Sequence, residues 1–477
     1  MGRPGPARPG RKVATGAAVT RGGAQMSRWN GRGRVAATVA VLAVLASGCA
    51  QQIPGLGSYS SGRTAVSDAK VDIRNTDDGP IDRLAGNAVF DIQQFWTQQM
   101  PQVFKERYQP VKAFYSIDPD GSTAAPCTDE PSDIRGNAFY CPGQDIVAWD
   151  RKILLPELKQ RFGDFLVAMV LAHEWGHAVQ KRTKLPSDRT IVVETQADCY
   201  AGAFTDYALK GGAPHFEIDR PTLDQALSGY LLFSDPLGSD ASDRQAHGSG
   251  FDRISAFQDG FEQGVSFCSK FSDSRTFTQA AFQSQTDQDN RGNLPLPDTL
   301  RQGPADVDAY WKDAYQKLYG QPWKPLAAIM PFPDSSRPQC SGQPVLDAQY
   351  CMADDTIYYD TDSLAKVYSQ TNGDFGAISM VALAYGEAVR SRRGLPAAVD
   401  SESALLGAIC TAGGYARDSF GQTSEERLRL SPGDLDEAIR ALLDAAGSSN
   451  FTRARGTTGF DRVRAFREGF NDAKSCK

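Results

Sequence analysis

Residues 164–182 read D-F-L-V-A-M-V-L-A-H-E-W-G-H-A-V-Q-K-R. Apolar residues recur here at helical spacing, and Asp164 stands where a residue that caps the amino end of a helix is expected. Lys181 and Arg182 fall in what would be the last turn, where positive charge stabilises a helix. The pattern predicts one helix over this whole stretch.

A His-Glu-x-x-His motif lies inside the predicted helix. His173 and His177 are four residues apart, so both imidazoles project from one face and can reach a single tetrahedral ion. Glu174 lies beside that face, where its carboxylate can take a proton from a metal-bound water. The alternative is a core helix with two hydrogen-bonded histidines. The glutamate and its place on the helix favour a zinc site.

A catalytic zinc ion needs a third protein ligand and an open fourth position. Sixteen residues separate His177 from Glu194, where the sequence E-T-Q-A-D-C-Y-A-G begins, and this stretch can form a second helix. Glu194 and Asp198 would then share a face of that helix. We expect Glu194 to bind the metal and Asp198 to accept the outer N–H of a ligand histidine. The alternative is two solvated carboxylates on a helix surface.

These motifs resemble a known family. H-E-W-G-H followed by E-T-Q-A-D-C-Y-A-G is similar to the gluzincin class and, in detail, to the bacterial neutral zinc metallopeptidase family, whose closing segment residues 247–261 also resemble. The resemblance covers most of residues 78–270. It implies an α+β fold, mainly helical and zincin-like with a small sheet, in which an edge strand beside the active-site helix aligns the substrate. Residues 145–150 are the candidate for that strand.

Two further histidines complete the set of four in the chain. His247 precedes a Gly-Ser-Gly turn and is a candidate donor to the oxyanion of the transition state. Its alternative role is a local cap or loop contact. His215, in G-G-A-P-H-F, is expected to be a loop residue only.

The expected function is peptide-bond hydrolysis. Zinc on His173, His177 and Glu194 would polarise the scissile carbonyl and acidify water, and Glu174 would move the proton to the leaving amine. The alternative is a zinc-containing scaffold or recognition protein of the cell envelope that cuts nothing.

Several segments of the first half recur in the same order about 210 residues later. The pairs are G-D-F at 163–165 and 373–375, A-V at 178–179 and 388–389, Cys141 and Cys351, Asp150 and Asp360, Cys199-Tyr-Ala-Gly and Cys410-Thr-Ala-Gly, and D-R-I-S-A-F-Q-D-G-F and D-R-V-R-A-F-R-E-G-F ending at Phe261 and Phe470. Two copies at so long a period predict a duplicated domain and not a solenoid.

The expected boundaries are 1–48 for a signal peptide, 49–77 for an anchor and tether, 78–271 for the peptidase domain, 272–294 for a linker and 295–477 for the second copy.

The second copy lacks the predicted metal-site residues. H-E-W-G-H becomes Leu383-Ala384-Tyr385-Gly386-Glu387, Glu194 becomes Leu405 and Asp198 becomes Ile409. Apolar residues would fill the space of the lost ion and leave no buried ligand unpaired. We therefore expect one zinc per chain, in the first domain only. The second copy would be a degenerate pseudo-peptidase that serves recognition, positioning, regulation or structural support.

Nine cysteines leave eight once Cys49 is assigned to a lipid. Each copy carries four in the same order, so four disulfides within copies are expected. The predicted pairs are Cys127 with Cys141, Cys199 with Cys268, Cys340 with Cys351, and Cys410 with Cys476.

The amino-terminal segment is typical of an exported lipoprotein. Residues 1–34 hold eight Arg and Lys and no acidic residue, and the apolar run from Val35 to Ala46 has the length of a signal-peptide core. S-G-C-A then resembles the lipobox of bacterial lipoproteins, which implies lipidation of Cys49 and an anchor on the extracytoplasmic face of the cell membrane. Met26 opens a more typical signal peptide and is a second candidate start.

Composition is that of a globular protein, with 41% hydrophobic and 23% charged residues. Without the eight basic residues of the leader, 43 Lys and Arg face 57 Asp and Glu, a net charge near −14. This acidity argues against nucleic-acid binding, which needs a basic surface.

Overall fold

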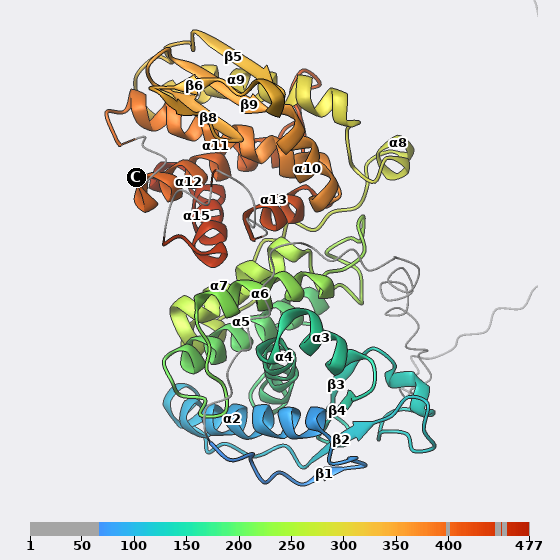
Figure 1. Cartoon of the computed structure of the whole chain (residues 1–477). Helices are drawn as coiled ribbons and strands as arrows, with labels where there is room; N and C mark the ends of the chain where they lie inside the picture. Colours follow the sequence, from blue (N-terminus) through green and yellow to red (C-terminus); the bar gives the residue numbers. More distant parts are fainter. Residues whose placement is uncertain (1–65, 397–400, 444–449, 451–455, 477) are drawn as a thin grey trace, which may run out of the picture. The chain divides into compact units, whose positions relative to one another are not determined.

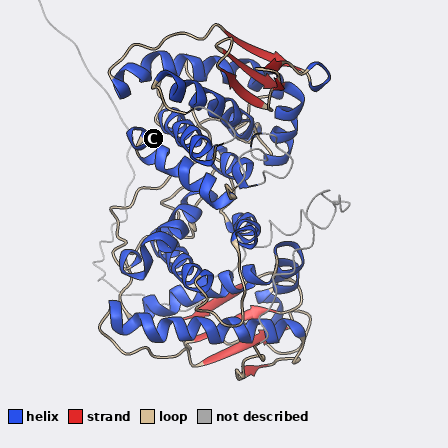
Figure 2. Ribbon diagram, turned by 60° about the vertical axis from the view of Figure 1, so that its left-hand side comes forward, coloured by secondary structure: helices blue, strands red, loops and turns tan. Residues whose placement is uncertain are grey.

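The structure is a computed structural model that describes residues 66–396, 401–443, 450 and 456–476. The predicted signal peptide, the second start at Met26 and the lipid site at Cys49 lie outside the described residues. The protein is a mixed α/β protein in which helices predominate and the sheets are small (Figures 1 and 2).

The first half begins with a four-stranded sheet and continues as helices. Its strands are β1 (Ile73–Arg74), β2 (Ala113–Ile117), β3 (Ala138–Cys141) and β4 (Ile146–Asp150). Its helices are α2 (Pro80–Val103), α3 (Leu154–Phe162), α4 (Asp164–Arg182), α5 (Thr190–Leu209), α6 (Arg220–Tyr230) and α7 (Gly250–Cys268). Short 3₁₀ turns lie at Pro131–Ile134 and Leu231–Phe233.

The predicted edge strand was wrong. The strand order is β1-β2-β4-β3, so β4, which lies within residues 145–150, is paired on both sides. It runs parallel to β2 and antiparallel to β3. All five of its residues are buried, as is usual for a central apolar strand. The edge strand on this side of the sheet is therefore β3.

The helix predicted at residues 164–182 is confirmed as α4, but its amino-terminal cap differs. Gly163 is the cap residue, and Asp164 is the first residue of the helix, with its carboxylate in an ion pair with Lys159. Gly176 lets α4 approach α5 closely, because a Cβ there would lie 2.6 Å from the Cα of Ala197. This close approach places the second helix of the motif beside the two histidines.

The glycines that recur in both halves of the sequence have a packing reason. A Cβ on Gly202 of α5 would lie 1.9 Å from the carbonyl oxygen of Phe257, and one on Gly260 of α7 would lie 1.7 Å from that of Cys199. Only glycine allows backbones to pack at this distance. In the second half, Gly413 and Gly469 make the same kind of contact.

The second half follows a similar order of elements, but its larger sheet has three strands, and it adds the short helix α8 and the hairpin of β6 and β7. After α8 (Gln285–Asp289) come α9 (Leu296–Tyr319), β5 (Ala328–Phe332), β6 (Gln339–Cys340), β7 (Gln343–Pro344), β8 (Ala348–Cys351), β9 (Thr356–Asp360), α10 (Thr361–Thr371), α11 (Asp374–Arg392), α12 (Glu402–Phe420), α13 (Asp434–Leu443) and α15 (Gly459–Asn471), with 3₁₀ turns at Asp334–Ser336 and Ala473–Ser475.

The strand order β5-β9-β8 matches β2-β4-β3 in direction as well as in sequence order. The pair β5 and β9 is parallel, and β8 runs antiparallel to β9. The register also agrees, because Ala138 pairs with Trp149 in the first sheet and Ala348 pairs with Tyr359 in the second. Both members of this pair are displaced by 210 residues, the spacing seen in the sequence.

The structure contains four disulfides, and their pairs are those expected from the sequence. They join Cys127 to Cys141, Cys199 to Cys268, Cys340 to Cys351 and Cys410 to Cys476. In each half, one bridge lies at the sheet and the other ties a helix to the end of the half.

Each half also caps a helix of the other. Asp224 of α6 accepts a hydrogen bond from the backbone N–H of Phe460 at the start of α15, over 2.7 Å. Asp436 of α13 accepts one from the N–H of Phe251 at the start of α7, also over 2.7 Å. A carboxylate at a helix amino end satisfies free N–H groups and complements the helix dipole. These reciprocal caps join the two halves.

Among the described residues, no helix combines the length and the apolar character needed to cross a membrane.

Candidate metal centre

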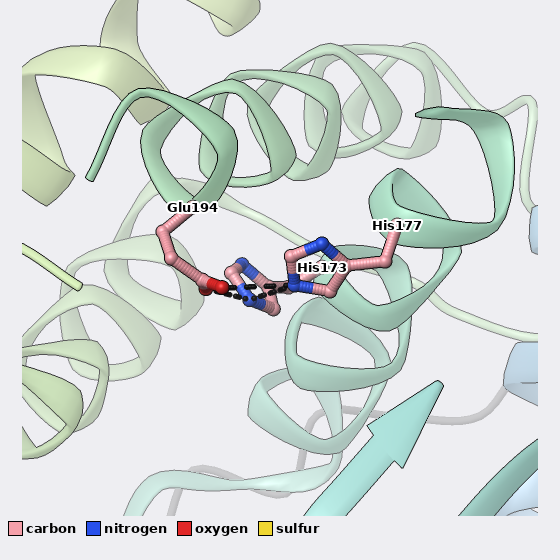
Figure 3. Close-up of side chains that lie close together, drawn as sticks. All are labelled: His173, His177 and Glu194. Carbon is pink, nitrogen blue, oxygen red and sulfur yellow. Dashed lines mark hydrogen bonds and ion pairs between the residues drawn. The ribbon is translucent and has the colours of Figure 1, made fainter. Parts of the chain in front are cut away.

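Two helices bring three predicted metal ligands together. α4 supplies His173 and His177, and α5 supplies Glu194 (Figure 3). The Nε2 atoms of the two histidines lie 3.2 Å apart, and Oε2 of Glu194 lies 3.2 Å from that of His173 and 3.4 Å from that of His177. Two nitrogens and one carboxylate oxygen thus converge on one point, as in a catalytic zinc site.

Asp198 lies where the sequence places it, behind His173. Its Oδ1 is 2.7 Å from Nδ1 of His173, which leaves Nε2 to face the convergence point. The carboxylate is fully buried and is held by Arg253, whose Nε donates to Oδ2 over 2.9 Å, and by the hydroxyl of Tyr230. Asp198 therefore orients the imidazole and raises its basicity.

His177 is oriented by a different partner. Its Nδ1 lies 3.0 Å from Oε1 of Gln180, one turn farther along α4. Gln180 is buried and donates through Nε2 to the carbonyl of Val193 over 2.7 Å and to Oε1 of Gln196 over 3.0 Å. The amide is thereby fixed, and the Nε2 atom of His177 is also turned toward Glu194.

The electrostatics of the site favour a bound cation. Burial acts to lower the pKa of His173, but the Asp198 carboxylate outweighs it and raises that pKa to about 10. Burial acts against the ionised form of Glu194, but the charges of His177 and His173 hold its pKa well below the usual range. Two imidazoles among three carboxylates thus attract positive charge, and the donor set of two nitrogens and one oxygen suits zinc.

Glu174 lies next to these ligands and also touches the sheet. The backbone N–H of Tyr140 in β3 donates to its Oε2 over 2.8 Å. Burial raises the pKa of Glu174, and the charges of His173 and His177 oppose that rise. A carboxylate with a raised pKa that is held beside the ligands is suited to accept and return a proton.

The remaining two histidines are outside the cluster. His247 is half-exposed, and its Nδ1 lies 3.3 Å from Oδ1 of Asp235, whose other oxygen accepts the backbone N–H of His247 over 2.7 Å. Burial acts to lower the pKa of His247. The hydrogen bond to Asp235 and the charge of Glu194 outweigh burial, so the pKa is raised. His215 is in a loop, as expected, but it is buried and paired with Asp91 over 2.8 Å.

Three residues that support the ligands were not singled out from the sequence, namely Gln180, Tyr230 and Arg253. A signal existed for two of them. Gln180 follows His177 by three residues and so shares its helix face. Arg253 belongs to the repeated D-R motif of the closing segment. Tyr230 carries no such signal, because only the packing of α6 against α4 brings it to Asp198.

The corresponding positions of the second half carry apolar side chains. Leu383, Leu405 and Ile409 are buried on α11 and α12. Glu387 accepts the backbone N–H of Tyr350 over 2.8 Å, and its Oε1 has no hydrogen-bond partner. Burial raises the pKa of Glu387 well above the usual range. Within the described ranges, no cluster of metal-binding side chains includes these four residues.

Comparison with known proteins agrees with this geometry. The family described as "Putative neutral zinc metallopeptidase" matches residues 9–271, more than half of the chain. The uncharacterized protein YpfJ of Escherichia coli is 30% identical over 193 residues, which cover 35% of this chain and 63% of that protein. The uncharacterized protein Rv2575 of Mycobacterium tuberculosis is 26% identical over 181 residues, 32% of this chain and 60% of that one. The chain thus spans less than two thirds of these relatives. No solved structure matches it.

Proposed function

The chain belongs to the family of neutral zinc metallopeptidases, and on this premise we propose that it hydrolyses peptide bonds with one zinc ion held by His173, His177 and Glu194. The observation that carries the proposal is the convergence of two Nε2 atoms and one carboxylate oxygen within 3.4 Å of one another, with Glu174 beside them. A protein site with three such ligands leaves a fourth position for water or substrate.

Zinc bound there would polarise the substrate carbonyl and lower the pKa of a water molecule. Glu174 takes the proton of that water and returns it to the leaving amine, for which its raised pKa suits it. Asp198 and Gln180 keep the two imidazoles oriented throughout.

Substrate alignment is assigned to β3. It is the edge strand of the sheet, and Tyr140 of β3 contacts Glu174. An extended peptide can add to such an edge through main-chain hydrogen bonds. His247 is assigned as a donor to the oxyanion, since it is half-exposed and its pKa is raised.

We also propose that residues 295–477 are a degenerate copy of a zincin-like domain at 78–271, joined by a linker at 272–294, and that this copy binds no zinc. Support comes from the matching strand directions and from pairing registers 210 residues apart. The apolar residues Leu383, Leu405 and Ile409 cannot bind zinc. The reciprocal caps of Asp224 and Asp436 favour a role in holding or positioning the first domain.

The protein is further proposed to be exported behind the signal peptide at 1–48 and anchored through a lipid on Cys49, on the extracytoplasmic face of the cell membrane. The four disulfides support export, since disulfides persist in oxidising compartments. Labelling with a palmitate analogue should mark the wild-type protein and not a Cys49→Ala variant.

A peptidase assay tests the central proposal. Activity on casein or a quenched peptide library should be lost with a zinc chelator and restored by zinc. A zinc-loaded protein that cleaves no member of the library would instead favour the scaffold alternative, in which the same ligands hold a structural ion.

A further inference from the structure

A second group of acidic side chains lies in the other half of the chain, away from the proposed zinc site. Asp374 begins α11, and Asp434 and Glu437 lie on the first turn of α13. One carboxylate oxygen from each falls within 4.8 Å of the others. All three side chains are at least nine-tenths buried. Nothing in the proposed peptidase mechanism uses them.

The charge of this acidic cluster is not balanced by the protein. Among the described residues, no ion pair reaches any of the three carboxylates, although the charge of Arg440 opposes the rise in pKa that burial causes at Glu437 and Asp436. The Arg440 Nη1 itself lies 3.4 Å from the carbonyl of Thr371. Asp287 adds further negative charge near Asp434. Buried charges of one sign are costly unless a counter-charge or a metal accompanies them.

One oxygen of the acidic cluster has no partner. Asp374 accepts the backbone N–H of Leu294 over 2.8 Å, Glu437 accepts that of Phe375 over 2.9 Å, and Oδ2 of Asp434 accepts that of Ser431 over 2.8 Å. Oδ1 of Asp434 is buried and has no hydrogen-bond partner. Because an unpaired buried carboxylate oxygen is unfavourable, it indicates a missing ligand.

The first half provides a comparison at the same place. Asp164 begins α4 as Asp374 begins α11, but Asp164 is paired with Lys159. At the 210-residue offset, Lys159 becomes Ser369. Asp224 and Asp436, which cap helices of the opposite half, can be aligned with each other. In that alignment Thr222 and Gln225 of the first half correspond to Asp434 and Glu437 of the second. The second half has therefore lost a cation and gained two acids at one position of the fold.

Gly373 and Asn293 border the acidic cluster. A Cβ on Gly373 would lie 1.8 Å from Oε1 of Glu437 and 2.4 Å from Oδ1 of Asn293, so only glycine at this position lets the carboxylate and the amide oxygen come this close to the backbone. Asn293 also lines a surface hollow. The hollow is lined by Asn290, Asn293, Pro295, Tyr368, Ser369 and Asn372.

We propose that Asp374, Asp434 and Glu437 bind a calcium ion, with the side-chain oxygen of Asn293 as a further ligand. All donors are oxygen, which suits hard cations and not zinc or copper. Calcium accepts six to eight oxygens in irregular geometry, whereas magnesium requires a near-ideal octahedron. The ion would join the segment at Asn293 to α11 and α13 and so stabilise the second half.

The test is calcium binding by the zinc-loaded protein without its leader. With calcium chloride as the only added ligand, equilibrium dialysis should give one calcium per chain, with a dissociation constant on the order of 10⁻⁵ to 10⁻³ M. The melting temperature should rise with calcium and rise less with the same concentration of magnesium chloride. Asp434→Asn should lose both the bound calcium and the calcium-dependent rise. Asp354→Asn, at an exposed site outside the acidic cluster, should keep them.

The opposite results would overturn the proposal. The proposal would be wrong if the wild-type protein bound no calcium and the Asp434→Asn variant melted at a higher temperature than wild type in chelator. These results would show that the three carboxyl groups share protons and hold no metal ion. An equal rise with magnesium would overturn the assignment to calcium. The dialysis count on wild-type protein does not depend on how well the variant folds, and it does not depend on peptidase activity.

Discussion

The backbone N–H of Tyr140 donates a hydrogen bond to Oε2 of Glu174 over 2.8 Å, which joins the edge strand β3 to α4, the helix of the proposed zinc site. In the second half, Tyr350 makes the same 2.8 Å contact with Glu387. Tyr350 is 210 residues after Tyr140, but Glu387 matches His177 and not Glu174. In both halves a glutamate thus accepts the N–H of the strand tyrosine, but the glutamate comes from different positions along the helix. The second half therefore offers a control for the first.

Replacement of Glu174 by Gln should abolish turnover without loss of zinc. The amide keeps an oxygen for the Tyr140 N–H but cannot take a proton from water, so kcat should fall by about 10²-fold or more. Steady-state kinetics and metal analysis would measure the two effects. Glu387→Gln is the matched control and should leave kcat unchanged. A Glu174→Gln variant with full activity would remove this residue from the mechanism.

Replacement of Asp198 by Asn should weaken zinc binding by about 10- to 100-fold, because the neutral amide no longer raises the basicity of His173. The protein should also lose stability in the absence of metal, since the buried Arg253 loses its charged partner. Competition with a zinc indicator and thermal melting would measure these effects. Asp206→Asn, on the same helix but paired with the exposed Lys210, should change neither. Unaltered zinc affinity in Asp198→Asn would contradict the orienting role.

The variant His247→Gln should distinguish the proposed role of this residue as a donor to the oxyanion from the alternative role as a local loop contact. If the imidazole donates to the oxyanion, kcat should fall by roughly 10²- to 10³-fold, with zinc content and KM little changed. If His247 only closes the loop through Asp235, the melting temperature should fall and kcat should not. Kinetics and melting of one variant therefore decide between catalysis and a local cap.

The acidic cluster predicts a pH-dependent stability in chelator. Burial raises the pKa of Glu437 to about 8, with a further rise from the charge of Asp374 that Arg440 opposes. Burial also raises the pKa of Asp374 to about 6, and burial together with the charges of Asp374, Glu437 and Asp287 raises that of Asp434 well above its usual range. A raised carboxyl pKa stabilises the fold at low pH and loses that contribution as pH rises through the folded value. The melting temperature should therefore fall between about pH 5 and pH 9.

Calcium should flatten this dependence, since it replaces the shared protons as the counter-charge. Melting curves across the same pH range, with and without calcium chloride, would measure the difference. A decline of equal size in both conditions would argue that no ion enters the acidic cluster.

Local patterns in the sequence were enough for the elements that carry the site. Apolar spacing predicted the helix at 164–182, and the i to i+4 spacing of His173 and His177 placed both rings on one face, since helix geometry depends only on nearby residues. The internal repeat led to the four cysteine pairs that the structure contains, because equal order in two copies restricts the pairing. The signal peptide and the lipid on Cys49 are predictions from the sequence alone.

Tertiary structure decided what depends on contacts between distant segments. Strand order made β3 and not β4 the edge, since an apolar run does not reveal its neighbours. Packing of separate helices brought Arg253 and Tyr230 to Asp198. It also brought Asp434 and Glu437 to Asp374, sixty residues earlier in the chain. The charge balance of a buried site depends on which groups the fold brings together, and the spacing of residues along the sequence does not reveal this.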